Sequence, residues 1–227
     1  MPTDSRIAAK WTAVDTYLTD TLGGDDSALT AALAANAAAG LPAIDVAPNQ
    51  GKFLHLLARL SHARRILEIG TLGGYSTLWL ARALPADGLL LSLELDPHHA
   101  EVARANIARA GLAAVVQVRV GPALDTLVQL VAANTQPFDL IFIDANKEAY
   151  PAYLEAAIQL SRPGTVILGD NVIRDGEVIH ADSADERVQG VRRFLAMLAA
   201  NPRLSATALQ TVGSKGYDGF AMALVVA

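Results

Sequence analysis

The chain has 227 residues, of which 52% are hydrophobic and 18% charged, and its formal net charge is −5. This much apolar surface excludes a disordered chain, and the length fits one α/β domain, so we expect a single domain spanning residues 1–227. The acidic balance, with no basic run longer than two residues, disfavours nucleic acid as a partner, and the absence of cysteine excludes disulfides and cysteine nucleophiles.

The N-terminal part, about residues 1–47, is predicted to be a helical extension that forms a lid or a dimer surface, with simple cover for the sheet as the alternative. Its first residues, MPTDSRIAAKW, lack the continuous apolar core of a secretory signal, which favours a cytoplasmic protein. The longest uncharged stretch, Ser27–Ile44, is mostly alanine and is interrupted by Asn36, Gly40 and Pro42. It is therefore too weakly apolar to span a membrane.

A helix is predicted to begin at Pro48, because proline is tolerated in the first turn, with Phe53, Leu57 and Leu60 on one face. Beyond it, short apolar runs alternate with segments of helical spacing. Each run is nearly continuous and is bounded by turn or acidic residues, which is typical of strands covered on both faces. The runs are Arg64–Gly70, Leu89–Asp96, Val115–Gly121, Phe138–Ala145 and Gly164–Asn171.

This repeated strand–helix–strand order predicts an α/β fold, a Rossmann-like doubly wound sheet that is mostly parallel, with helices on both faces. The end of the chain differs from this pattern. Two more apolar runs, Ser205–Gly213 and Gly219–Ala227, are separated only by a short turn at residues 214–218. Two strands joined so tightly predict an antiparallel C-terminal hairpin at one edge of the sheet.

Ligands of open α/β sheets bind at the carboxyl ends of the strands. Three glycines follow the first strand in the sequence EIGTLGGYS, where they would let a ligand approach the backbone. Their spacing differs from the G-x-G-x-x-G of dinucleotide sites. The loop is therefore interpreted as a site for another nucleoside-type ligand, and the alternative is a plain turn. Glu94 ends the second run and either accepts hydrogen bonds from ribose hydroxyls or is solvated. Glu68 lies inside a buried strand, so we expect it to need a cationic or amide partner.

The fourth and fifth runs end in oxygen-bearing side chains, Asp144 and then Asp170 and Asn171. If these strands are neighbours, the three side chains converge as a hard ligand set for Mg²⁺, Mn²⁺ or Ca²⁺, whereas the alternative is helix capping or solvent exposure. Lys147 either accepts a proton beside such a cation or is an exposed lysine at a helix start. The five histidines show no metal-binding spacing and are interpreted as surface or core residues.

Several blocks in a fixed order, ILEIGTLGGYST, LELDP, GPAL, FIDANKEAY and ILGDNVIRDG, resemble the cation-dependent class I S-adenosylmethionine (SAM) O-methyltransferases. This is the family of the caffeoyl-CoA and catechol enzymes and their bacterial relatives. The likeness extends from about Pro48 to the C-terminus, and it implies a homodimer.

The resemblance also implies roles for individual residues. Family contacts to SAM fall on Val46, Glu68, Gly70, Thr71 and Ser76 for the methionine part, Glu94 for the ribose and Ala123 for the adenine, with Asp144 beside them. The cation ligands fall on Asp144, Asp170 and Asn171, and the catalytic roles fall on Asp144 and on Lys147 as the base.

The chain departs from the family pattern at three positions. Pro122 stands where relatives commonly have Asp, which affects the backbone donors near the adenine. Asn146 replaces the second acid of a D-A-D-K pattern, so a charged contact to the SAM amine becomes neutral. Asp175 stands where plant relatives place an Asn that meets substrate, so the plant acceptor does not carry over.

The resulting hypothesis is a metal-dependent O-methyltransferase that moves a methyl group from SAM to one hydroxyl of a catechol-like phenolic small molecule. Mg²⁺ is the first choice of cation. Three alternatives stay open: a tRNA hydroxyl methyltransferase of the same family, an NAD-dependent oxidoreductase on a similar fold, and a non-catalytic SAM-binding protein. The loops Val172–Arg187 and Lys215–Gly219, together with the N-terminal helices, are expected to select the acceptor, whose identity no residue type specifies.

Overall fold

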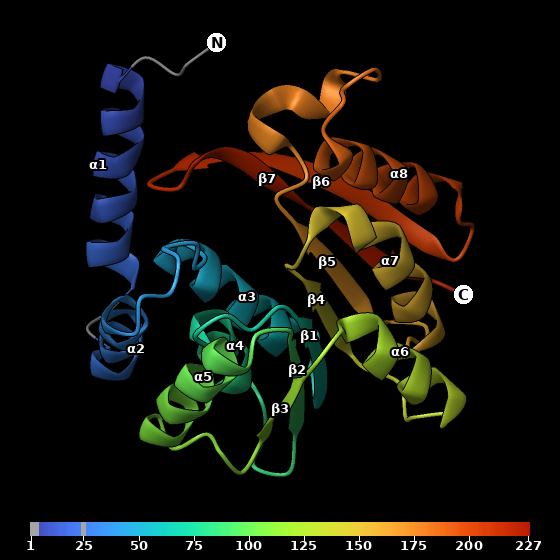
Figure 1. Cartoon of the computed structure of the whole chain (residues 1–227), viewed down its shortest axis with the longest axis horizontal. Coiled ribbons are helices and arrows are strands. Elements are labelled where there is room, and N and C mark those ends of the chain that lie inside the picture. Colours follow the sequence, from blue (N-terminus) through green and yellow to red (C-terminus); the bar gives the residue numbers. More distant parts are fainter. Residues whose placement is uncertain (1–4, 24–25) are drawn as a thin grey trace.

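Seven strands form one sheet in the computed structural model, which describes residues 5–23 and 26–227 (Figure 1). Their order across the sheet is β3-β2-β1-β4-β5-β7-β6, and β1 to β5 pair in parallel. The strands are β1 (Arg65–Ile69), β2 (Leu89–Glu94), β3 (Val116–Val120), β4 (Leu140–Ile143), β5 (Val166–Asp170), β6 (Leu204–Gly213) and β7 (Gly216–Val225). The predicted parallel strands and the neighbouring positions of β4 and β5 are confirmed.

The C-terminal hairpin lies at the sheet edge as predicted, with β7 antiparallel to both β5 and β6. Its turn is shorter than the predicted 214–218, because Gly213 pairs with Gly216 and leaves only two residues between the strands. Gly216, the first residue after the turn, has a φ of +93°, a conformation that glycine adopts without steric cost.

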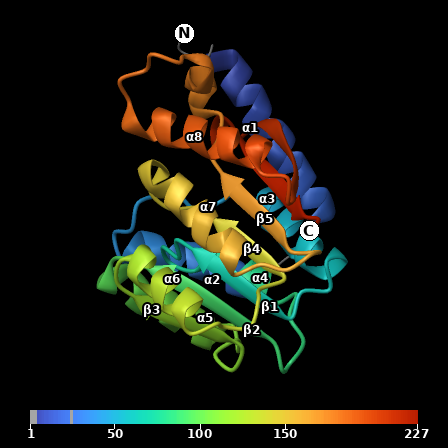
Figure 2. The ribbon, with the colours of Figure 1, turned by 90° about the vertical axis from the view of Figure 1, so that its right-hand side faces the viewer.

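Helices cover both faces of the sheet, and each face has its own apolar cluster. One face carries α6 (Ala123–Ala132), α7 (Tyr150–Gln159) and α8 (Glu186–Ala200). Figure 2 views the molecule from this side. The opposite face carries α3 (Pro48–Leu60), α4 (Tyr75–Ala81) and α5 (Pro97–Arg109). The predicted two-sided arrangement is therefore confirmed.

Helix α3 begins at Pro48 as predicted, but a different face of the helix is buried. The buried residues are Gly51, Leu54 and Ala58, whereas Leu60 is 77% exposed. The reason is the Trp79 ring of α4, which occupies the space where a side chain at position 51 would lie, 2.3 Å from an added Cβ. Phe53 and Leu57 are only partly buried and pack against the edge of the same apolar cluster.

Two N-terminal helices complete the structure, α1 (Ser5–Leu22) and α2 (Ser27–Ala38). Helix α1 contacts the β6–β7 hairpin, where its buried Asp15 accepts a hydrogen bond from the backbone N–H of Ser214 at 2.7 Å. Helix α2 packs against α4 and α5. Two short 3₁₀ segments, η1 (Lys147–Ala149) and η2 (Arg174–Ile179), follow β4 and β5. In the described part of the chain, no helix has the length and apolar character needed to cross a bilayer.

Candidate active site

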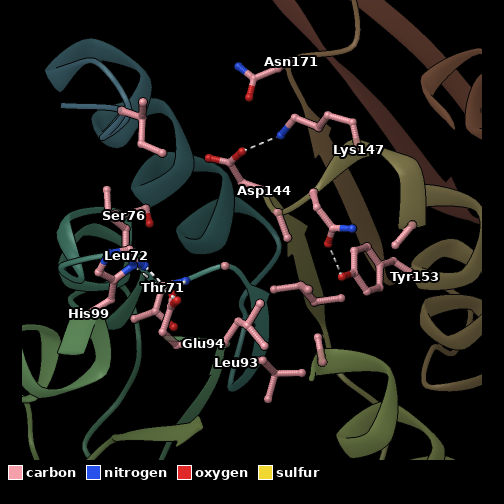
Figure 3. Close-up of a pocket in the computed structure, with 18 of the residues that line it drawn as sticks. Thr71, Leu72, Ser76, Leu93, Glu94, His99, Asp144, Lys147, Tyr153 and Asn171 are labelled. Carbon is pink, nitrogen blue, oxygen red and sulfur yellow. Dashed lines mark hydrogen bonds and ion pairs between the residues drawn. The ribbon is translucent and has the colours of Figure 1, made fainter. Parts of the chain in front are cut away.

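The carboxyl ends of the parallel strands open into a cavity of about 790 Å³ (Figure 3). A volume of this size is typical of small-molecule sites. All of the site residues predicted from the sequence line this cavity except Glu68 and Asp170. Those in its wall are Val46, Gly70, Thr71, Ser76, Glu94, Ala123, Asp144, Lys147 and Asn171.

The glycine loop between β1 and α4 owes its glycines to packing within the protein. A Cβ at Gly70, whose φ is +101°, would lie 2.0 Å from the carbonyl oxygen of Asp144. A Cβ at Gly73 would lie 1.9 Å from the side-chain oxygen of Asn36. Packing within the protein therefore already requires glycine at these two positions, and Gly70 also lies in the cavity wall, where a ligand can approach its backbone.

Two buried asparagines hold the glycine loop, and the sequence argument missed both. The amide nitrogen of Asn106 on α5 donates to the carbonyl oxygen of Gly73 at 2.8 Å and to the side-chain oxygen of Asn36 at 3.0 Å. Asn36 on α2 in turn donates to Asp45 Oδ1 at 2.9 Å. The available signal was a polar residue inside an alanine-rich helix, where asparagine is a poor helix former.

Glu94 ties the end of β2 to the glycine loop. Its Oε2 accepts the backbone N–H groups of Thr71 at 3.0 Å and Leu72 at 2.7 Å, and its Oε1 accepts that of Asp96 at 3.0 Å. His99 Nδ1 lies 3.5 Å from Oε1, and His99 also lines the cavity. The histidine was not expected at the site, and its place in the first turn of the helix after Glu94 was the only signal.

Glu68 is fully buried beneath the cavity wall, and its partners are hydroxyl groups. Ser76 Oγ donates to Oε1 at 2.6 Å, while Thr77 Oγ1 and Ser92 Oγ donate to Oε2 at 2.5 Å and 2.6 Å. The expected cationic or amide partner is wrong, because these short side chains satisfy the carboxylate locally. Burial nevertheless outweighs these bonds and raises the pKa of Glu68 to about 7.

The raised pKa of Glu68 predicts a pH-dependent stability. The folded protein holds this proton more tightly than the unfolded chain, whose Glu has its ordinary pKa of 4.5. The stabilisation is therefore fully present below about pH 4.5 and is lost as the pH rises through about 7. Glu68→Gln should remove up to roughly 1.4 kcal/mol per pH unit of this slope in the free energy of unfolding.

Urea denaturation at a series of values between about pH 5 and about pH 8 measures this slope. Glu101→Gln, a substitution of an exposed acid on α5, is the matched control and should keep the wild-type slope. Equal slopes for Glu68→Gln and the wild type would contradict the assignment.

The predicted oxygen donors meet at the ends of β4 and β5, which pair in register from Leu140 with Val166 onward. Asp144 and Asn171 line the main cavity, and Asp170 and Asn171 line a second cavity of about 380 Å³, so the three lie where the two cavities adjoin. Asn171 has a φ of +54°, and in Figure 3 its amide oxygen is directed toward the Asp144 carboxylate. No group of three or more His, Cys, Asp or Glu residues suited to a metal occurs among the described residues, so a cation site here depends on the Asn171 amide.

The environment of Asp170 fits a bound cation. Its carboxyl group is 4% exposed and accepts hydrogen bonds from the Gln50 side chain at 2.7 Å and from the backbone N–H of Asn171 at 2.8 Å. Burial, followed by the negative charge of Asp144, raises the pKa of Asp170 to about 7. A buried carboxyl group whose ionisation is disfavoured, next to a second carboxyl group and an amide oxygen, is a donor set that a hard divalent cation would stabilise.

Lys147 is buried beside these donors, so the alternative of an exposed lysine at a helix start is wrong. Its Nζ donates to Asp144 Oδ1 and to the Tyr150 hydroxyl, each at 2.8 Å (Figure 3 shows the Asp144 bond). The Tyr150 hydroxyl lies within hydrogen-bond distance of the carbonyl oxygens of Ile143, at 2.9 Å, and Asp170, at 2.8 Å. Burial raises the pKa of Tyr150 well above its ordinary value, so the phenol stays protonated and holds the lysine in place.

Comparisons with known proteins agree with this geometry. The sequence model of the O-methyltransferase family matches residues 23–224. A catechol O-methyltransferase from Niastella koreensis is 58% identical over 213 residues, which cover 94% of this chain and 96% of the relative. The solved structure of an O-methyltransferase from Bacillus cereus in complex with SAH has a TM-score of 0.94 and 60% identity, and the match covers 96% of this chain and 99% of that one.

The O-methyltransferase TomG from Streptomyces achromogenes, solved in complex with SAM, has a TM-score of 0.94 and 51% identity over 97% of this chain and 99% of its own. The NAD-dependent oxidoreductase and the non-catalytic SAM-binding protein are therefore wrong alternatives. The cavity at the strand ends, its glycine loop and these relatives agree that the chain belongs to the O-methyltransferase family and is a SAM-dependent O-methyltransferase.

Proposed function

We propose that the protein methylates one hydroxyl of a catechol-like phenolic small molecule with the help of a divalent cation, Mg²⁺ in the first place. The observation that carries this proposal is the meeting of Asp144, Asp170 and Asn171 at the junction of two cavities, with Lys147 bonded to Asp144. The name of the Niastella koreensis relative, a catechol O-methyltransferase, supports the same acceptor class.

SAM is assigned to the part of the main cavity beside β1 and β2. Val46, Gly70, Thr71 and Ser76 would surround its methionine part, Glu94 would accept the ribose hydroxyls and Ala123 would contact the adenine. Glu94 supports this assignment because its carboxylate lines the cavity while three backbone N–H groups fix its position. When bound, SAM supplies a methyl group on a positively charged sulfur.

The cation is assigned to Asp144, Asp170 and Asn171. These oxygen donors suit Mg²⁺, and also Mn²⁺ and Ca²⁺, better than zinc. When bound, the ion supplies positive charge that lowers the pKa of an adjacent phenol hydroxyl. Asp144 lines the main cavity as well, so this residue would face both the cation and the methyl donor.

Lys147 is placed to take the proton of the acceptor hydroxyl. Two of the positions around its nitrogen are used in the bonds to Asp144 and Tyr150. Lys147 also lines the cavity, so the hydroxyl of an acceptor bound there can come within reach of this nitrogen. Asp144 and Tyr150 thus fix the orientation of the base.

We propose a small phenol, and not tRNA, as the acceptor. The cavity wall contains the acids Asp45, Glu94, Asp144 and Glu148 and the bases Lys147, Arg174 and Arg187, together with His99. A surface that follows a phosphate backbone needs a clear excess of positive charge, and this mixed wall has none.

Incubation with methyl-labelled SAM, Mg²⁺ and catechol tests the proposal, and the expected product is the labelled monomethyl ether. Phenol, which has a single hydroxyl, should give no comparable product, and EDTA should stop the reaction until Mg²⁺ is added back. Undiminished catechol methylation in EDTA would overturn the role of the cation. Transfer of the label to tRNA without any transfer to catechol would overturn the acceptor.

A further inference from the structure

The main cavity extends past Lys147 and Asn171 to two arginines that the sequence argument did not single out. Arg174 lies at the start of η2 and Arg187 lies in the first turn of α8, and both are in the cavity wall. The partners of the two guanidinium groups differ, and this difference indicates what the end of the cavity binds.

Arg187 is already paired within the protein. Its Nε and a terminal nitrogen donate to the Asp185 carboxylate at 3.0 Å and 2.7 Å, and its side chain is 55% exposed. A two-bond arginine–carboxylate pair satisfies the charge of both groups. Glu148 lies near enough to raise the pKa of Arg187 further, after Asp185 itself, so this guanidinium has no need of another anion.

Arg174 has no such pairing. Its side chain is 24% exposed, and its Nε is fully buried and has no hydrogen-bond partner. Among the described residues, the only ion-pair partner of its guanidinium is Asp218, whose Oδ2 lies 3.7 Å from a terminal nitrogen, beyond hydrogen-bond distance. A buried nitrogen donor without a partner is costly, and the guanidinium group of arginine suits carboxylates in particular.

Asp218 is engaged mainly with the backbone of this loop. Its Oδ1 accepts the N–H groups of Ile173 at 2.9 Å, Arg174 at 3.0 Å and Gly219 at 3.0 Å. Two of these bonds fix the backbone at the start of η2, where Arg174 and Asp175 have φ values of +55° and +56°, a conformation that non-glycine residues rarely adopt. Strained backbone that its surroundings maintain is common at ligand sites.

We propose that Arg174 binds a carboxylate on the acceptor, so that the preferred substrate is a phenolic acid with two vicinal hydroxyls. This inference rests on the proposed catechol-type function and adds the charge of its substrate. Asn171 and Arg174 belong to the same short loop after β5. One loop would therefore bind the hydroxyl end of the acceptor near Asn171 and the anionic end at Arg174.

Three probes that share the 1,2-dihydroxybenzene ring test the proposal: 3,4-dihydroxybenzoate, catechol and 3,4-dihydroxybenzylamine, which are anionic, neutral and cationic. For the wild type we expect the highest kcat/KM with the benzoate. Arg174→Gln should lower the ratio of kcat/KM for the benzoate to that for catechol by about tenfold or more, mainly through KM, because a charge-assisted hydrogen bond is lost. Arg174→Glu should reverse the preference in favour of the benzylamine.

Arg193→Gln is the matched control, since Arg193 lies on α8, is 53% exposed, does not line the cavity and pairs only loosely with Glu186 at 3.9 Å. This variant should keep the wild-type ratio.

The proposal is overturned if the wild type prefers catechol to the benzoate, or if Arg174→Gln keeps the wild-type ratio. If a variant fails to fold, the inhibition of the wild type by 3-hydroxybenzoate is compared with its inhibition by phenol. Equal inhibition by the two compounds overturns the proposal. A wild type that methylates none of the three probes would instead overturn the proposed function.

Discussion

Replacing Asp170 by asparagine is expected to lower kcat/KM for a catechol acceptor by about a hundredfold or more at a fixed Mg²⁺ concentration, because one of the two ligand carboxylates loses its charge. The substitution preserves the shape of the side chain, and the new amide can still accept the Asn171 N–H. Gln50, which donates to Asp170 at 2.7 Å, can turn its own amide to meet the new group. Asp170 does not line the main cavity, so the affinity for SAM should change little.

Titration of the activity with Mg²⁺ and calorimetry of SAM binding separate these two effects. We expect a much higher half-saturating Mg²⁺ concentration for Asp170→Asn. The matched control is Glu155→Gln, which removes an exposed acid on α7 that lines neither cavity and should keep the wild-type Mg²⁺ requirement and turnover. A normal Mg²⁺ requirement and normal turnover in Asp170→Asn would contradict the cation site.

Replacing Lys147 by alanine is expected to lower kcat by about 10²- to 10⁴-fold, the usual contribution of a general base. Lys147→Arg should be nearly as poor, because a guanidinium keeps the positive charge but cannot accept a proton at accessible pH. Both variants should recover part of their rate as the pH rises, since the acceptor hydroxyl then ionises without help.

The pH dependence of kcat, measured for both variants beside the wild type, tests this role. Lys10→Gln, on the exposed face of α1, removes a lysine charge far from the cavity wall and should leave kcat unaltered. If Lys147→Arg turns over like the wild type, the lysine acts through its charge alone and is not the base.

The parallel strands could be predicted because burial on both faces requires a nearly continuous apolar run. Such a run can be recognised in the sequence without knowing which strands lie beside it. The hairpin turn could not be placed to the residue, because its length depends on Gly213 pairing with Gly216 across the turn. The buried face of α3 was likewise mispredicted. It is set by the Trp79 ring against Gly51, and no periodicity within α3 contains that information.

The residues of the cavity walls could be predicted from the strand ends, since Asp144 follows β4, Asp170 ends β5 and Asn171 comes directly after it. Residues that act through contacts between distant segments were missed. Asn36 and Asn106 are hydrogen-bonded although 70 positions separate them in the sequence. Each one, taken alone, is only a poor helix former within a helix. The loose pairing of Arg174 is equally invisible, because it depends on the 3.7 Å distance to Asp218 and on the burial of the Nε nitrogen without a hydrogen-bond partner.

The contact between Asn36 and Gly73 makes part of the region before Pro48 necessary for the glycine loop. A fragment starting at Pro48 would contain every strand and all of the recognisable family blocks. It would nevertheless lack the amide that fills the space beside Gly73 and bonds to Asn106 and Asp45. The glycine loop would then border a void where it should be supported, so the shape of this loop depends on α2, although α2 contributes no residue to the cavity wall.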